Sequence, residues 1–420
     1  MTQDVAVVDG SERLSAAYWA LLLYCALFVV PVRWETQLTT VGLLDVFILG
    51  LAGYLLWHHD TVLKLLLRTP ATFPFLIYLA VVMLSLAVAR DGADFLKEIV
   101  KTVQAFVLYV GFAMLVWRHR RPQLYERSVW IWTSTFFVIV VIAVIWQYHF
   151  IRTVPMPNPI TDPETSRRYF RFGWGPFALS NYFAGMLLVL IPVLWYRLSA
   201  WRSLRLIPAL MIGVALFVFL AALAFTFSRG AVAAFAVGLF LMALDRAPGQ
   251  RFRILLLLLA VGLAVVFIIT VPMGRRLIDF AGRSIVEITN DRIFVWQEAL
   301  GTIQERPLLG VGFGNYGAQL SEQPWAHNFV LQSLVETGVI GALAYGGFLA
   351  GVGWTLLRVR RATRHSTDWW VFHGMWAAFA IMLLHNLVEN TLIGVLYLFL
   401  FWPLQALALA RYWQEENIPA

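Results

Sequence analysis

One histidine stands where the chain passes from polar into apolar sequence, a position that suits proton transfer. His327 and Asn328 follow Pro324 and precede the apolar run that begins at Phe329. Proline readily precedes a helix but cannot continue one, so we expect His327 and Asn328 in the first turn of a membrane-spanning helix. The positive end of the helix dipole there favours the neutral imidazole ring. A neutral imidazole can accept a proton, which is the property that a general base needs.

The same segment carries an acid and two small residues farther along. Glu336 would lie well down the helix, where a carboxyl group is rare without a partner or a water-filled cavity. Gly338 and Gly341 would lie on one face, one turn apart, and would allow a neighbouring helix to approach closely. A lone histidine at a helix end is more often a cap or an interface residue, and these neighbours favour the catalytic interpretation.

Arginine residues supply the second chemical clue. Arg229 lies in a turn of a few residues between two apolar runs, so it is held close to the membrane surface. Arg292 would project from a surface helix with Trp296 one turn further on. A guanidinium group offers a planar fork of donors that suits phosphate oxygens. We expect both arginines to bind phosphate; the alternatives are interface anchoring for Arg229 and a solvated helix face for Arg292.

Other polar residues could complete a site on this side of the membrane. Arg168 and Arg171 precede an apolar run and could close over a headgroup from the opposite direction. His385 and Glu389, near the end of the eleventh apolar run, are expected to support a cavity from behind. Glu98 stands between two lysines and should pair locally.

The residue spacing indicates neither a metal centre nor a cofactor. The sequence has no His-x-x-x-His pair, no Asp-x-Asp and a single cysteine, Cys25. The run Gly310-Val-Gly312-Phe-Gly314 resembles a nucleotide fingerprint only superficially, because no βαβ unit surrounds it. We interpret it as a flexible turn. If group transfer occurs here, the charge on a leaving phosphate must be met by arginine.

The elements that hold these residues should be membrane-spanning helices. The chain is 60% hydrophobic and only 13% charged, whereas a soluble domain is about 25% charged. Several continuous apolar runs reach the roughly 20 residues that cross a bilayer as a helix, and they do not alternate as barrel strands would. The sequence predicts an all-α polytopic membrane protein with one integral membrane domain over residues 1–420. The twelve expected spans lie near 17–32, 38–57, 72–89, 95–117, 128–150, 176–198, 206–227, 230–245, 254–273, 328–357, 371–391 and 394–411.

Basic loops predict the orientation of these spans. The net charge is +8, and five short arginine- and lysine-rich loops would all face the cytoplasm if both termini are cytoplasmic. Two longer loops, 151–175 and 274–326, would then lie on the opposite face. The second loop should contain a surface helix over 291–303. Its expected apolar face consists of Ile293, Trp296, Leu300 and Ile303.

These residues together resemble a known family. His327-Asn328, followed after nine residues by Gly338-x-x-Gly341, resembles the H-[NSQ]-x9-G-x-x-[GTY] signature of O-antigen ligases and their polymerase relatives. Arg229-Gly230 is similar to the family's Arg-Gly element. Arg292-x-x-x-Trp296, followed by Pro307 and a glycine-rich stretch, resembles its large periplasmic loop. The resemblance covers essentially the whole chain.

The resemblance implies a GT-C-like, lipid-carrier-dependent glycosyltransferase in a Gram-negative inner membrane, with its active site facing the periplasm. The implied reaction is inverting and metal-independent, and needs no cofactor. Its donor would be O-antigen on undecaprenyl pyrophosphate, and its acceptor a sugar hydroxyl of lipid A–core. Carried over by position, His327 would be the base, and Arg229 and Arg292 would hold the donor pyrophosphate.

Other functions stay open on the sequence. O-antigen polymerases and protein O-oligosaccharyltransferases share these elements, so the motifs leave the acceptor undecided. A transporter of anionic lipid-linked solutes would also explain many spans and outer arginines. A matched pair of interrupted helices in the two halves of the chain is the usual pointer to such a transporter, and the sequence shows no such pair.

Overall fold

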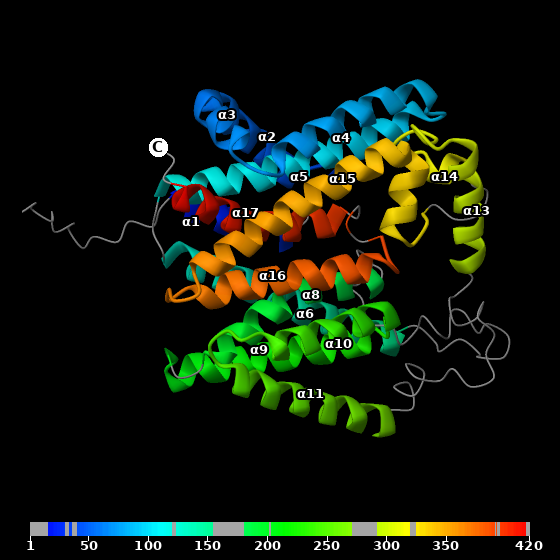
Figure 1. The fold of residues 1–420 in the computed structure, drawn as a ribbon. Helices are drawn as coiled ribbons and strands as arrows, with labels where there is room; N and C mark the ends of the chain where they lie inside the picture. The colour runs from blue at the N-terminus through cyan, green and yellow to red at the C-terminus, as the bar shows by residue number, and fades with distance from the viewer. Residues whose placement is uncertain are drawn as a thin grey trace, which may run out of the picture.

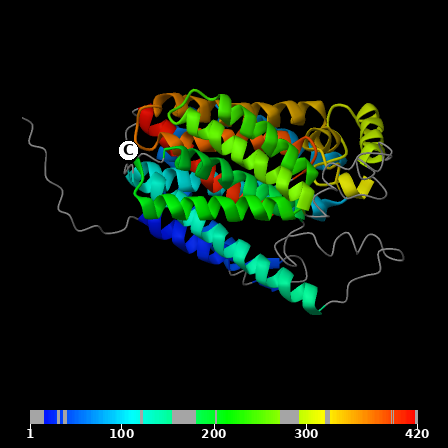
Figure 2. The same ribbon diagram turned by 90° about the horizontal axis from the view of Figure 1, so that it is seen from below.

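The fold comes from a computed structural model that describes residues 16–29, 33–35, 40–119, 123–153, 180–200, 203–270, 292–319, 325–390, 392 and 395–416. Long helices run side by side through it and form a bundle (Figure 1, Figure 2). The first half contains α1 (Ala16–Val29), α2 (Leu43–Trp57), α3 (His59–Leu67), α4 (Thr72–Ser85), the 3-10 turn η1 (Leu86–Val88), α5 (Gly92–His119), α6 (Gln123–Thr153) and α8 (Ser180–Ser199). The second half contains α9 (Leu206–Phe225), α10 (Arg229–Leu244), α11 (Gln250–Thr270), α13 (Arg292–Glu305), α14 (Tyr316–Gln319), α15 (Phe329–Ala362), α16 (Trp369–Asn386) and α17 (Val395–Glu415).

The described part is helical apart from one small hairpin, in which β1 (Arg33–Glu35) pairs antiparallel with β2 (Thr40–Gly42). Five helices are long and apolar enough to cross a membrane: α5, α6, α8, α9 and α15. The pair α2 and α3 meets the same test together, with a bend of 85°. The predicted class of all-helical membrane protein is therefore confirmed. Each predicted span contains a helix, but length and composition do not by themselves establish twelve crossings.

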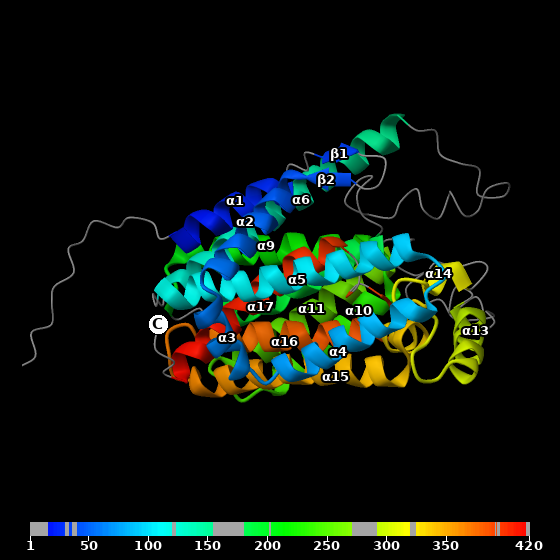
Figure 3. The ribbon, with the colours of Figure 1, turned by 90° about the horizontal axis from the view of Figure 1, so that it is seen from above.

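The centre of the bundle is built around α8, which packs mainly against α16 and α9 and is buried along most of its length. Close packing there depends on Gly374 of α16, because a Cβ at this position would lie 2.4 Å from the Cα of Val193. The pairs α5–α17 and α4–α15 form the neighbouring layer, visible from above in Figure 3. Toward the outside, α9 exposes large apolar side chains such as Met211 and Phe217, as a lipid-facing helix would.

The basic loops gather at one end of the bundle. Arg118 Nη1 lies 2.7 Å from His58 Nε2, and Arg364 donates to the carbonyl of Arg246 at 3.2 Å. Arg253 is fully buried and donates to four backbone carbonyls around the turn between α10 and α11. The other end, which we call the α13 end, carries α13, α14 and the start of α15 (Figure 1).

The predicted continuous helix after His327 is wrong. The helix α15 is broken at Gly338, whose φ of 65° and ψ of −172° are not helical. Figure 1 shows the part before the break running beside α13, across the direction of the bundle, and the part after it running through the bundle. His327 lies before the helix and not in its first turn, since Asn328 is the N-cap. Glu336 closes the short first part and does not lie deep in a continuous span.

Backbone contacts from the glycine-rich stretch explain this break. The amides of Val311 and Gly312 donate to the carbonyls of Val335 and Glu336 at 2.8 and 3.1 Å. Val339 N, just past the break, donates to the carbonyl of Pro307 at 2.8 Å. The interpretation of this stretch as a flexible turn is therefore wrong, because its backbone caps the interrupted helix.

Two further predictions need correction. Gly338 does not share a helical face with Gly341; only Gly341 lies in the helix, against Val81 of α4. The surface helix exists as α13, but its inward face differs from the predicted one. Ile293, Trp296 and Ile303 are half-buried as predicted, but Leu300 is 50% exposed, and Val295 and Ala299 complete the inward face instead.

Candidate functional site

Three separate elements, α10, α13 and the start of α15, meet at the segment that follows α16. Arg292, the first residue of α13, donates to the carbonyl of Val388 and to Glu389 Oε1. Gly230, next to Arg229 at the start of α10, lies against Val388. His327 Nδ1 lies 3.3 Å from Glu389 Oε2. Residues far apart in the sequence therefore face one place at the α13 end.

The backbone around His327 is held on both sides. Trp296 Nε1 donates to the carbonyl of Ala326 at 3.0 Å, and the amide of Ala326 donates to Gln332 Oε1 at 2.8 Å. Asn328 Oδ1 accepts from the amides of residues 330 and 331, while its Nδ2 donates to the carbonyl of Leu387 at 2.9 Å. Asn328 therefore caps α15 and ties it to the end of α16.

Backbone strain also concentrates here. Within the described residues, positive φ outside glycine occurs at His327, with φ 48°, and at Phe227, with φ 51°. One is the candidate base, and the other lies two residues before Arg229. Strained backbone of this kind is retained where surrounding contacts over-determine it, often at functional sites.

Glu389 is the common partner at the centre. Its side chain is 4% exposed, and its carboxylate accepts from Arg292, from Asn181 of α8 and from His327. Burial alone would raise the pKa of Glu389, but the hydrogen bond from His327 and the charge of Arg292 outweigh it and lower the pKa below the usual glutamate value. The carboxylate is therefore held in its charged form.

This contact decides which imidazole nitrogen can act as a base. An ionised carboxylate only accepts hydrogen bonds, so Nδ1 of His327 carries the hydrogen that faces Glu389. Nε2 then keeps its lone pair, and the His327 side chain is 29% exposed. A ring oriented by a carboxylate, with its other nitrogen accessible, is the arrangement of a general base.

Residues 214–346 match a family model described as O-antigen ligase. This region belongs to the O-antigen ligase superfamily. A search of curated proteins found no match. The matched region contains Arg229, Arg292 and His327, whereas Glu389 lies beyond it.

The structure brings Arg292, Trp296, His327 and Asn328 together. Arg229 is placed by its neighbour Gly230, which lies against Val388. Glu389, expected to support the cavity from behind, contacts His327 and Arg292 directly. The other predicted site residues fall away from this centre or outside the description. Gly338 forms the break in α15 and Gly341 packs on α4; Glu336 accepts from Gln332; Arg168 and Arg171 lie outside the described residues.

His385 has an unusual environment beside this site. Its side chain is fully buried at the end of α16, near Gly230, and no hydrogen bond to either ring nitrogen is found within the described residues. An unsatisfied buried polar group costs about 1–3 kcal/mol. Its place beside Gly230 and near Glu389 suits a second support of the site.

Sequence reasoning missed Asn181 and Gln332. Asn181 is a polar residue in the first turn of the buried helix α8, and its amide donates to Glu389. Gln332 precedes Glu336 by one helical turn, and it holds Ala326 as well as Glu336. A polar side chain inside an otherwise apolar run was the available signal in both cases.

The described residues contain no group of three or more histidine, cysteine, aspartate or glutamate side chains that could hold a metal ion. Positive charge at the site comes from guanidinium groups. With two of its five N–H groups directed to Val388 and Glu389, Arg292 retains donors for a phosphate oxygen.

Proposed function

We propose that this protein is an O-antigen ligase. It would move O-antigen polysaccharide from undecaprenyl pyrophosphate to a sugar hydroxyl of lipid A–core. The observation that carries the proposal is the contact of both Arg292 and His327 with Glu389, with Gly230, next to Arg229, against the adjacent Val388. Cations for a diphosphate and a base for a hydroxyl stand within one site, which is what such a transfer requires.

In the proposed reaction, His327 Nε2 removes the proton of the acceptor hydroxyl as its oxygen attacks the anomeric carbon of the donor sugar. The bond between that carbon and the pyrophosphate oxygen breaks, and its electron pair stays on the pyrophosphate. Arg229 and Arg292 stabilise the added negative charge. Attack opposite the leaving group inverts the configuration at the anomeric carbon. Glu389 stabilises the imidazolium that results.

We further propose a GT-C-like chain of twelve spans in a Gram-negative inner membrane, with the α13 end in the periplasm and both termini in the cytoplasm. The gathering of the basic loops at the opposite end supports this orientation. Arg168 and Arg171, in the loop over 151–175, would approach the donor from the same side.

The test uses the purified full-length protein in detergent with carrier-linked O-antigen and lipid A–core. The unmodified protein should form the glycan–lipid A–core product, and His327→Ala should lower the rate by about 10²–10⁴-fold, the usual contribution of a general base. The matched control is His365→Ala, since this histidine is exposed at the opposite end of the bundle.

Other outcomes would assign other functions. Longer carrier-linked glycan in place of the lipid A–core product would identify a polymerase. Absence of any glycosidic product, together with movement of the donor across vesicles, would identify a transporter. A His327→Ala rate equal to that of His365→Ala would remove His327 from the chemistry.

A further inference from the structure

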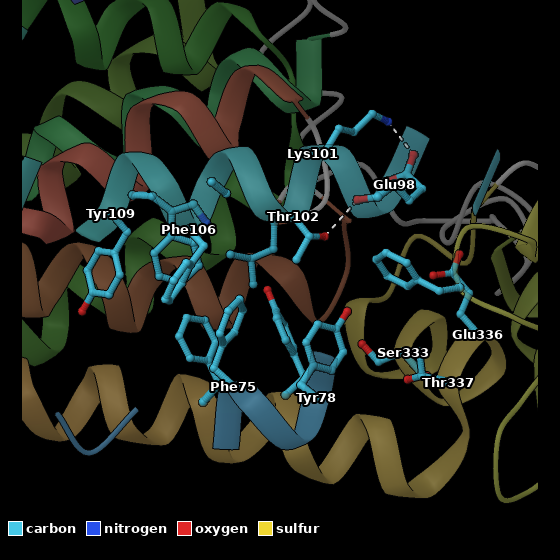
Figure 4. Close-up of a pocket in the computed structure, with 16 residues that line it drawn as sticks. Phe75, Tyr78, Glu98, Lys101, Thr102, Phe106, Tyr109, Ser333, Glu336 and Thr337 are labelled. Atoms are coloured by element: carbon cyan, nitrogen blue, oxygen red, sulfur yellow. Dashed lines mark hydrogen bonds and ion pairs between the residues drawn. The ribbon is translucent and has the colours of Figure 1, made fainter. Parts of the chain in front are cut away.

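A second feature at the α13 end is a chamber between α4, α5, α15 and α17, drawn in Figure 4. Its volume is about 50 Å³. Because one buried water needs roughly 10–15 Å³ of such space, the chamber holds about three to five waters. This volume can hold part or all of one small ring, and it is too small for a polyprenyl or acyl chain.

The chamber is polar at one end. Glu98 and Lys101 of α5 form an ion pair there, and their side chains are 16% and 27% exposed, so solvent reaches this end. Glu336 and Ser333, from the short first part of α15, stand opposite (Figure 4). The carboxyl groups and the hydroxyl group provide hydrogen-bond acceptors and donors from two sides.

The rest of the chamber is aromatic. Phe75 stacks on Phe106 with ring centroids 4.4 Å apart. Tyr78 lies 4.9 Å from Tyr345, measured between ring centroids. Phe313, from the glycine-rich stretch, contacts Tyr78 edge to face at 6.2 Å. These rings offer flat apolar surfaces beside the polar end.

Charge narrows the class of ligand. Among the described residues that line the chamber, the one cation is Lys101, and it is already paired with Glu98. A phosphate group would therefore meet two carboxyl groups and no unpaired cation. A neutral ring with several hydroxyl groups fits better, because its hydroxyls can bond the polar end while its C–H faces lie on the aromatic rings.

We infer that this chamber is a binding site for one neutral sugar residue of the acceptor glycan. The inference rests on the proposed function for the identity of the glycan. It also gives the two substrates different sites: the anionic end of the donor lies with the arginines, and an uncharged acceptor sugar lies in the chamber.

The chamber and the base share two structural elements. Ser333 lines the chamber four residues after Phe329, about 6 Å along the helix axis, and His327 stands just before that helix. Leu392 lines the chamber three residues after Glu389. The sugar in the chamber is therefore near the reacting hydroxyl but separate from it.

The test measures binding without turnover. Saturation-transfer NMR on the purified full-length protein uses methyl β-D-glucopyranoside and methyl β-D-galactopyranoside as probes, with glucose 1-phosphate as the charged comparison. The unmodified protein and His327→Ala should both give a signal with at least one methyl hexoside. Glucose 1-phosphate can bind at the arginines, so its signal should persist in a variant whose chamber is filled. A glucose 1-phosphate signal that filling the chamber abolishes would place a charged ligand there and overturn the inference.

Matched variants locate the site. Ala105 lines the chamber, so Ala105→Leu should fill it and abolish the signal, while Val103→Leu, at a 47% exposed position on the same helix, should keep it. Tyr78→Phe keeps the aromatic face and should bind, whereas Tyr78→Leu should not. Unchanged binding by both Ala105→Leu and Tyr78→Leu would show that the sugar binds elsewhere.

Transfer kinetics separate this inference from the proposed function. Ala105→Leu should raise the acceptor KM by about tenfold while the donor KM stays within about twofold, because only acceptor binding is removed. A rise in the donor KM alone would assign the chamber to the donor and overturn the inference. If hexosides bind but no transfer occurs, the proposed function fails while the sugar site stands.

Discussion

Glu389 contacts His327 and also binds Arg292, so one carboxylate links the proposed base to an arginine proposed to bind phosphate. Glu389→Gln would keep the shape but lose the negative charge. Hydrogen bonds to charged groups contribute about 1.5–3 kcal/mol. We expect kcat to fall by about 10–100-fold, comparable to the loss of other orienting partners. Asp60→Asn, at an exposed position in α3, is the control. An unchanged kcat would mean that His327 does not depend on Glu389.

The pH dependence of the Tm of the same variant tests whether Glu389 is charged in the folded protein. Since the folded-state pKa lies below the ordinary value of 4.5, the charged carboxylate stabilises the fold above that value. This stabilisation is lost as pH falls through the lower, folded-state pKa. The unmodified protein should therefore have a higher Tm than Glu389→Gln near neutral pH, and the difference should shrink only in acid below 4.5. A difference that vanishes well above 4.5 would contradict the lowered pKa.

Arg292 uses the shape of its guanidinium group as well as its charge. Its two terminal nitrogens reach Val388 and Glu389 together, which a lysine ammonium cannot reproduce in the same geometry. Arg292→Lys should raise the donor KM and lower kcat, for an overall loss of about 10-fold or more in kcat/KM. Steady-state assays with carrier-linked donor measure both constants. Activity equal to the unmodified protein would show that charge alone suffices, and Arg306→Lys on the exposed turn after α13 is the control.

At the scale of elements, the break in α15 places the base. A Cβ at Gly338 would lie 2.1 Å from the carbonyl oxygen of Leu308, and φ there is 65°. Gly338→Ala therefore adds strain of about 1–3 kcal/mol as well as a steric clash. The substitution should shift the N-terminus of α15 and, with it, His327. A displacement of about 1 Å can lower the rate by about 10²-fold. Transfer assays and thermal unfolding measure the two effects.

Gly346 provides the matched control for this prediction. It lies in the same helix with nothing within 4 Å of an added Cβ. Gly346→Ala should keep full activity and add about 0.5–1 kcal/mol of stability, as alanine does in a helix interior. Equal behaviour of the two variants would contradict the role given to the break.

The helices themselves could be predicted because each one corresponds to a continuous apolar run in the local sequence. Residues 206–225 are continuously apolar, and α9 follows that run closely. The break at Gly338 could not be predicted in this way. It depends on the amides of Val311 and Gly312, whose approach is decided by tertiary packing. A helical period read across 329–362 therefore placed Glu336 at the wrong depth.

The site was predictable residue by residue but not in its connections. Arginine and histidine side chains at the ends of apolar runs identified Arg229, Arg292 and His327. Glu389, the common partner of Arg292 and His327, lies 62 residues from His327 in the sequence, and no local pattern connects the two. Asn181 was missed for the same reason, since it reaches Glu389 across 208 residues.

For the whole molecule, the proposed mechanism requires the α13 end to face the compartment where both lipid-linked substrates present their sugars. The one cysteine, Cys25, is buried, so single cysteines can report on each end. Leu308 is 61% exposed at the α13 end, and His365 is exposed at the opposite end. In cells with a permeabilised outer membrane, Leu308→Cys should react with an impermeant maleimide. His365→Cys should react only after the inner membrane is opened, and the unmodified protein should stay unlabelled.

The reverse pattern would place the arginines and the proposed base in the cytoplasm. The outer-face ligase reaction would then fail even if every contact around Glu389 is correct, because chemistry and compartment are independent requirements of the same proposal.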